Sequence, residues 1–175
     1  GVTLQELERL DEALASYEDA LKIDPNIPEA LLGMARNLAL TEPEKASAQL
    51  EHAMATNPNF IGGHLLAAEQ NIDSEQYDKA QQDITKALAV NPKSTEALSL
   101  LASISFLRDN KEEFNKYVAQ VLAINPAFSK LYDIIADNCV SNRLYKQAVD
   151  FSREALRLNP NDWGAMSVLG VNLMR

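Results

Sequence analysis

The sequence is poor in cysteine, glycine, proline and positive charge. Its 175 residues include one cysteine, six glycines and seven prolines, and 16 Lys and Arg stand against 25 Asp and Glu, for a net charge of −9. A single cysteine forms no internal disulfide, and the low glycine and proline content excludes collagen-like and low-complexity chains. Nucleic-acid binding needs concentrated Lys and Arg, so no nucleic-acid partner is expected. No apolar run approaches the roughly 20 residues of a membrane span, so none is expected in this segment.

Alanine and leucine are abundant instead, with 24 residues of each. Both lose little conformational freedom on entering a helix, so the composition favours a helical protein. The length suits one domain, or one elongated array, with a sizeable core.

Five of the seven prolines follow a fixed spacing of 33, 34, 34 and 34 residues, and each comes directly after Asp or Asn: Pro25, Pro58, Pro92, Pro126 and Pro160. A constant period in this range is typical of a repeat architecture. The residue before proline is disfavoured in the α region, so each Asx-Pro pair is predicted to end a helix.

Between successive Asx-Pro pairs the pattern predicts two helices separated by a short polar break. The first helix carries its apolar and small residues at i, i+3, i+4 and i+7, as in Leu98, Leu101, Ala102 and Ser105. This spacing places one side of the helix in a core. The predicted helix nearest the C-terminus has the same spacing, with Met166, Leu169, Gly170 and Leu173.

Small residues recur at equivalent positions, where they allow two helices to approach closely. In the first helices these are Ala35, Ala68, Ala102, Ala136 and Gly170, and in the second helices Ala13, Ala46, Ala80 and Ala148, with Ala20, Ala53, Ala87 and Ala155 seven residues later. Only the third full repeat departs from the rule, with Phe114 and Val121. A larger side chain at a closely packed position costs about 1–3 kcal/mol. The two helices of the third repeat are therefore expected either to lie further apart or in another register, or to accommodate the larger residues by packing against Ala102.

The small residues together with the closing Asx-Pro resemble the tetratricopeptide-repeat (TPR) family over essentially the whole chain. The resemblance implies an all-α fold, a right-handed α-solenoid (superhelix) of antiparallel helix pairs. The repeats would be a half repeat at 1–25, full repeats at 26–58, 59–92, 93–126 and 127–160, and a half repeat at 161–175. Solenoid ends need polar caps, and the last helix has none. We therefore interpret the chain as a segment of a larger protein, with self-association through uncapped ends as the other way of covering the apolar faces.

Residues suited to catalysis are scarce. His52 and His64 lie in different predicted helices without the spacing of a metal site, and His64 falls at a packing position. Cys139 lies on an apolar stripe with no histidine placed to activate it. We expect both His64 and Cys139 to be structural, and we expect no enzyme activity, no metal and no cofactor.

In TPR-like arrays the first helices line a concave groove, and the residues expected to face it lie off the core stripe. They are Leu32, Arg36, Leu65, Glu69, Ser99, Ser103, Asp133, Asp137 and Ser167, with Phe106 and Lys130 near the same face. The clamp of Lys, Asn and Arg with which some family members hold an acidic chaperone tail does not carry over, because only Arg36 is basic among the matching positions. We expect a non-catalytic scaffold that binds a neutral-to-basic protein or peptide segment with apolar anchors.

Two alternatives remain open at the level of sequence. The inner face could be solvated, with no ligand in this segment. The array could also be the repeat arm of a larger enzyme, since Arg143–Arg175 is similar to repeats that precede zinc-peptidase-like domains in some bacterial proteins. A helical repeat that binds RNA is disfavoured by the net charge. The compartment, cytoplasmic or periplasmic, is left open.

Overall fold

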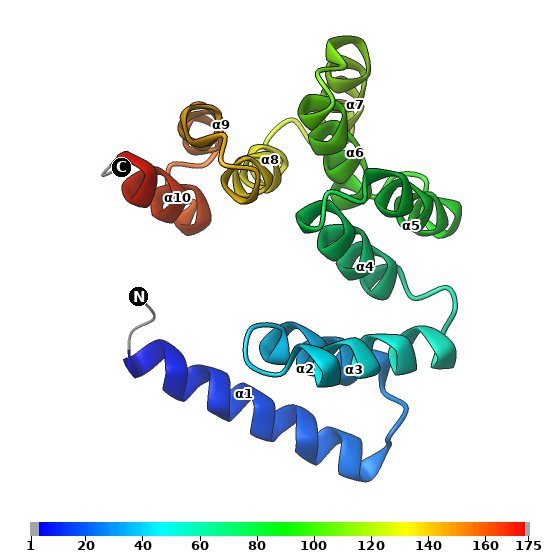
Figure 1. The fold of residues 1–175 in the computed structure, drawn as a ribbon. Coiled ribbons are helices and arrows are strands. Elements are labelled where there is room, and N and C mark those ends of the chain that lie inside the picture. Colours follow the sequence, from blue (N-terminus) through cyan, green and yellow to red (C-terminus); the bar gives the residue numbers. More distant parts are fainter. Residues whose placement is uncertain (1–3, 174–175) are drawn as a thin grey trace. The chain divides into compact units, whose positions relative to one another are not determined.

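The computed structural model describes the backbone of residues 4–173 and the side chains of residues 11–171. This part of the chain is helical throughout, without strands (Figure 1). The helices are α1 (Leu4–Ile23), α2 (Pro28–Leu38), α3 (Pro43–Thr56), α4 (Ile61–Asp73), α5 (Tyr77–Val90), α6 (Thr95–Leu107), α7 (Lys111–Ile124), α8 (Lys130–Ser141), α9 (Tyr145–Leu158) and α10 (Trp163–Leu173). Two compact units, residues 1–67 and 68–175, divide the chain within α4. Within the described residues, no helix is both long and apolar enough to cross a membrane.

The first unit is built on the pair α2 and α3. Its core contains the buried side chains of Ala35, Leu50 and Leu66. Helix α1 packs on α2, where Gly33 leaves room for the ring of Tyr17, which would have to shift if a Cβ atom were added at this position. Helix α2 begins at Pro28, a residue that suits the first turn because its missing N–H would have no partner there.

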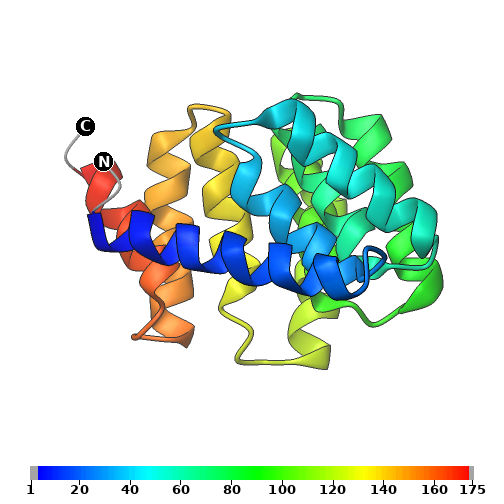
Figure 2. The ribbon, with the colours of Figure 1, turned by 90° about the horizontal axis from the view of Figure 1, so that it is seen from below.

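The second unit contains α5 and the pairs α6–α7 and α8–α9, followed by α10. Helices α8 and α9 run antiparallel, side by side, in yellow and orange in Figure 2. The main apolar cluster joins Ala102 and Val121 with Leu131, Ile135 and Ala148, and half-buried Phe114 packs against it. Val121 is fully buried in the same cluster as Ala102. This arrangement favours the compensated packing of the third repeat over a wider helix pair.

Each Asx-Pro pair ends a helix, as predicted. Helix α1 ends before Asp24, and α3, α5, α7 and α9 have asparagine as the C-terminal cap. In all five cases the Asx side chain accepts a hydrogen bond from the backbone N–H two residues on, at 2.9–3.1 Å: Asp24, Asn57, Asn91, Asn125 and Asn159. Proline has no N–H, so this bond satisfies the first donor after the helix. The division into repeats at these points stays a prediction.

The predicted small residues lie where the helices of a pair meet. Ala35, Ala68, Ala102 and Ala136 in the first helices are fully buried. So are most of their counterparts in the second helices, namely Ala46, Ala53, Ala80, Ala87, Ala148 and Ala155. Three predicted members differ: Ala13 and Ala20 on α1 are half-buried, and Gly170 on α10 is exposed.

Candidate partner-binding site

A hollow of about 240 Å³ lies in the second unit among residues of α4, α6 and α8. These are the helices predicted to line the groove. Its apolar lining consists of Leu100 on α6 and Ile134 on α8. Its polar lining consists of the carboxylates Glu69, Asp73 and Asp137 together with Asn138 and Ser141. The hollow therefore combines an apolar surface with negative charge.

The surroundings of Asp137 raise its affinity for a proton. The pKa of Asp137 is raised to about 6, first by loss of surrounding water and then by the negative charges of Asp133, Asp73, Glu69 and Asp162. Asp137 is exposed to solvent, and the crowding of carboxylates around it favours its neutral form. A positive charge in the hollow would relieve this repulsion.

Asp133, which the sequence also assigns to the groove, is directed elsewhere. A Cβ atom at Gly164 would lie 2.6 Å from Asp133 Oδ2, so this carboxylate packs against the first turn of α10, and glycine allows the approach. Burial, followed by the charge of Asp162, raises the pKa of Asp133, and the exposed Lys130 opposes this shift. Asp133 Oδ1 is buried without a hydrogen-bond partner. Asp133 therefore belongs to the contact with α10 rather than to the hollow.

Two predicted groove residues are not on an open surface, which corrects the prediction for them. Ser99 and Ser103 on α6 are fully buried, since α6 is flanked by other helices of the unit. Ser99 Oγ donates to the carbonyl oxygen of Thr95 at 2.7 Å. Ser103 Oγ accepts a hydrogen bond from Asn138 Nδ2 at 2.8 Å. Ser103 thus orients a residue of the hollow instead of meeting a partner directly.

The other predicted residues are spread over both units. Leu32 packs against the core of the first unit, Leu65 is half-buried and Arg36 is exposed. In the second unit Ser167 is exposed on α10. Phe106 packs edge to face on Phe151, with ring centroids 4.8 Å apart. Of the predicted set, the structure brings Glu69 and Asp137 together at the hollow.

Sequence reasoning missed most of the lining, namely Asp73, Leu100, Ile134, Asn138 and Ser141. A usable signal was present. Leu100, Ile134 and Asn138 each come one residue after a predicted groove position, at Ser99, Asp133 and Asp137. Helical side chains point back towards the N-terminus, so a given spot is covered by a residue about one position further along. On α6 and α8 part of the lining therefore lies one residue beyond the predicted stripe, while Glu69 and Asp137 line the hollow at predicted positions.

Two other hollows are less suited to a partner segment. One, of about 310 Å³, is lined only by Glu42–Lys45 at the start of α3, so it involves a single helix end. The other, of about 280 Å³, lies beside Phe106 and Phe114, with Lys111 and Asp109 at its border. Neither joins first helices of different repeats.

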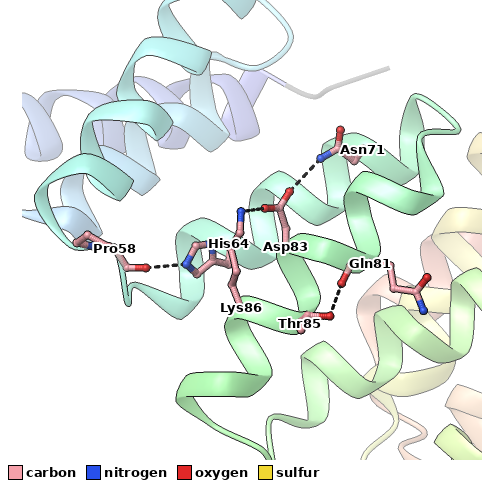
Figure 3. Close-up of polar contacts among 7 residues, drawn as sticks. All are labelled: Pro58, His64, Asn71, Gln81, Asp83, Thr85 and Lys86. Carbon is pink, nitrogen blue, oxygen red and sulfur yellow. Dashed lines mark hydrogen bonds and ion pairs between the residues drawn. The ribbon is translucent and has the colours of Figure 1, made fainter.

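His64 and Cys139 are both buried, and the Nδ1 atom of His64 has no hydrogen-bond partner there. His64 is buried, and its Nε2 lies 2.8 Å from the carbonyl oxygen of Pro58 (Figure 3). Figure 3 also shows Asp83 on α5, which accepts from Asn71 on α4 and from Lys86. Cys139 is buried, and burial raises the pKa of its thiol to about 12, which favours the protonated form. Among the described residues, no three His, Cys, Asp or Glu side chains could hold a metal ion together.

Comparisons with known families agree with this repeat geometry. Family models described as tetratricopeptide repeat match residues 1–27 and 65–127, slightly more than half of the chain. The chain is a TPR protein. No curated protein sequence matches it significantly. TPR proteins are generally scaffolds that bind protein or peptide partners.

Several solved structures share the helical-repeat solenoid fold with this TPR chain. The thermophilic TPR protein TTC0263 from Thermus thermophilus is similar with a TM-score of 0.69 at 22% identity, over 98% of this chain and 94% of that one. PilF from Pseudomonas aeruginosa has a TM-score of 0.63 at 17% identity, over 98% and 85% of the two chains. YrrB, described as a TPR protein with an unusual peptide-binding site, has a TM-score of 0.53 at 19% identity, over 94% and 85%. At these identities the likeness shows the fold alone.

Proposed function

We propose that this TPR chain is a non-catalytic scaffold that binds a neutral-to-basic segment of a partner protein along its first helices. The hollow among α4, α6 and α8 is the central contact. The observation that carries the proposal is the placement of Glu69, Asp73 and Asp137 around the apolar surface of Leu100 and Ile134. The peptide-binding site named for YrrB is consistent with such a role.

The chemistry of the hollow selects a lysine or arginine side chain. The long aliphatic stem of either residue packs on apolar surface while its charged end stays near solvent and negative charge. Half-buried Ile134 would contact the stem above the buried Leu100, and exposed Asp137 would meet the cation. An acidic segment would instead add to the repulsion that already raises the pKa of Asp137.

Peptide arrays followed by fluorescence anisotropy test the proposal. We expect peptides with Lys or Arg next to apolar residues to bind, and peptides with acidic C-termini not to bind. Affinity should fall as salt concentration rises, because the exposed carboxylates are screened. Asp137→Asn combined with Glu69→Gln should weaken binding about tenfold or more, the loss expected for removing two charges from a partly enclosed contact.

Glu112→Gln combined with Asp150→Asn is the matched control. Both residues are exposed in the second unit and outside the hollow, and the double substitution changes the net charge by the same amount. The control should keep nearly full affinity. Equal weakening of binding by both double substitutions would mean that net charge, and not the hollow, determines affinity. Either this result or a preference for acidic C-termini would overturn the proposal.

The alternative of a repeat arm in a zinc-peptidase-like protein draws no support from the matched families and structures reported above, which are repeat proteins. It would also leave the hollow without a role. The scaffold function accounts for the hollow and is therefore the better proposal.

A further inference from the structure

Asn138 is the most buried polar residue that lines the hollow among α4, α6 and α8. It is 8% exposed, whereas Glu69 is half-buried and Asp73 and Asp137 are exposed. The Nδ2 atom of Asn138 donates a hydrogen bond to Ser103 Oγ at 2.8 Å. No described residue donates to Oδ1, the other end of the amide, and this atom keeps access to solvent. The hollow therefore contains a hydrogen-bond acceptor that a bound group can reach.

A chain of hydrogen bonds across three helices holds Asn138 in place. Ser103, which accepts from its amide, is fully buried on α6. The Nδ2 atom of Asn142, at the end of α8, donates to the backbone carbonyl oxygen of Asn138 at 2.8 Å. The hydroxyl of Tyr77 on α5 donates in turn to Asn142 Oδ1 at 2.9 Å. A polar side chain that is buried and bonded in this way is fixed in one orientation, so its free oxygen is positioned before any partner binds.

The free oxygen restricts the kind of cation that fits the hollow. A cation that displaces water from Asn138 Oδ1 must donate a hydrogen bond in its place, because a buried polar atom left without a partner is unfavourable. The ammonium group of lysine has three N–H donors. A trimethylated lysine keeps the positive charge but has no donor, and sites for such quaternary groups use aromatic faces. None of the described residues that line the hollow is aromatic.

We propose that Asn138 Oδ1, held in place by Ser103, accepts a hydrogen bond from the ammonium group of a bound lysine, so that the hollow selects an unmodified lysine over a trimethylated one. The inference rests on the proposed function, because it concerns the same hollow, and it specifies the chemical state of the side chain that binds there. Trimethylation of the partner's lysine would weaken the contact without changing the charge of the partner.

Fluorescence anisotropy with two forms of one peptide tests the inference. The probe is the lysine peptide that binds best on the peptide array, prepared once with its lysine unmodified and once with its lysine trimethylated. The two forms carry the same charge and differ in their N–H donors. We expect the affinity of the trimethylated form to be lower by roughly tenfold or more, because a hydrogen bond to a charged group is among the stronger ones.

Substitutions at the acceptor identify the residue responsible. Asn138→Leu keeps a side chain of similar shape without the amide, so it should lower the affinity for the unmodified peptide roughly tenfold and remove most of the preference. Asn115→Leu, at an exposed asparagine of α7 that does not line this hollow, is the matched control and should keep the full preference. Ser103→Ala removes the hydroxyl that holds Asn138 and should reduce the preference as well. The readout is the ratio of two affinities, which a general loss of stability does not change.

The possible outcomes separate this inference from the proposed function. Equal affinity for the two forms of the peptide would overturn the inference alone, because charge and apolar contact would then account for binding. Absence of binding by every lysine peptide would overturn both. A folded Asn138→Leu chain that keeps the full preference would also overturn the inference, since the methyl groups would then be excluded by their size. If circular dichroism shows that Asn138→Leu does not fold, Ser103→Ala decides by the same criterion.

Discussion

The two units turn from a first helix to a second helix in different ways. In the second unit, Glu75, Asp109 and Arg143 follow the ends of α4, α6 and α8 with φ values of 57°, 54° and 61°. The next N–H in each turn bonds the carbonyl five residues back, at 2.7–2.8 Å. This pattern is the Schellman motif. In the first unit, the N–H groups of Thr41 and Glu42 both bond the carbonyl of Leu38, and no described residue there has a positive φ.

The difference accompanies a change in repeat length. The three left-handed residues are 34 positions apart, whereas the first spacing, from Pro25 to Pro58, is 33. The missing residue lies between Ala35 and Ala46, which are 11 positions apart where Ala68 and Ala80 are 12 apart. Helix α2 ends earlier after its small residue than α4 does, and four residues rather than three connect it to α3, which starts at Pro43. The buried faces of the second helices, by contrast, are alike in both units. Core substitutions should therefore cost the same in both units, and turn substitutions should not.

The largest expected effect tests the shared core. Leu50 and Ile84 occupy equivalent positions on α3 and α5 and are 6% and 0% exposed. Leu50→Ala and Ile84→Ala should each lower the free energy of unfolding by about 2–5 kcal/mol through lost burial and a new cavity. Native-state hydrogen exchange would assign each loss to its unit. Leu40→Ala, at a position that is 96% exposed, is the control and should have little effect. A large loss of stability from only one of the two core substitutions would contradict the expectation that the two cores are equivalent.

The next effect tests the Asx turns, which both units share. Asn57→Ala and Asn91→Ala each remove the side-chain oxygen that accepts a hydrogen bond from the backbone N–H two residues on. Each should cost about 1 kcal/mol in chemical denaturation, the usual net value of one hydrogen bond. Asn91→Asp should be nearly neutral, because Asp24 makes the same bond at 2.9 Å. Equal losses for the Ala and Asp variants would show that the hydrogen bond contributes nothing.

The turn substitutions should differ in sign between the units. Glu75→Gly relieves a left-handed backbone that disfavours a Cβ atom and should stabilise the second unit by about 1 kcal/mol. Thr41→Gly adds only chain entropy to the unfolded state and should cost roughly 0.5–1 kcal/mol. Thermal unfolding measures both. Glu75→Ala is the control: it removes the charge but keeps the Cβ atom, so it should not relieve the left-handed backbone. A Thr41→Gly substitution that stabilises the protein would contradict the assignment of the two turns.

The smallest effect is a dependence on pH confined to the second unit. The pKa of Asp137 is raised from 3.8 to about 6, so the folded state holds this proton more tightly than the unfolded state. The resulting stability is fully present below pH 3.8 and is lost as pH rises towards 6. Asp137 is exposed, so solvent screening limits the effect to less than about 1 kcal/mol. Asp137→Asn should flatten this part of the pH profile of unfolding, while the first unit should keep its own profile.

Much of this fold follows from local chemistry that a sequence displays. Asx-Pro pairs end helices because proline has no N–H, so the helix ends were predictable. A period of 34 residues places small residues where helices cross, so core positions such as Ala80 and Ala136 were predictable as well. The turns were less so. Glu75 and Arg143 adopt a left-handed conformation that usually signals itself through glycine. The hollow depends on side-chain direction and on neighbours across the unit, which buried Ser99 and Ser103 and turned Asp133 towards α10.

The Asx-Pro boundaries also have a consequence for the chemical ageing of the chain. Exposed asparagines lose ammonia when the backbone nitrogen of the following residue attacks the side-chain carbonyl. Asn57, Asn91, Asn125 and Asn159 are all exposed. Each is followed by proline, whose nitrogen carries no hydrogen and cannot complete the attack. The exposed asparagines that begin each connection are thus protected from deamidation by the same residue that ends the helix.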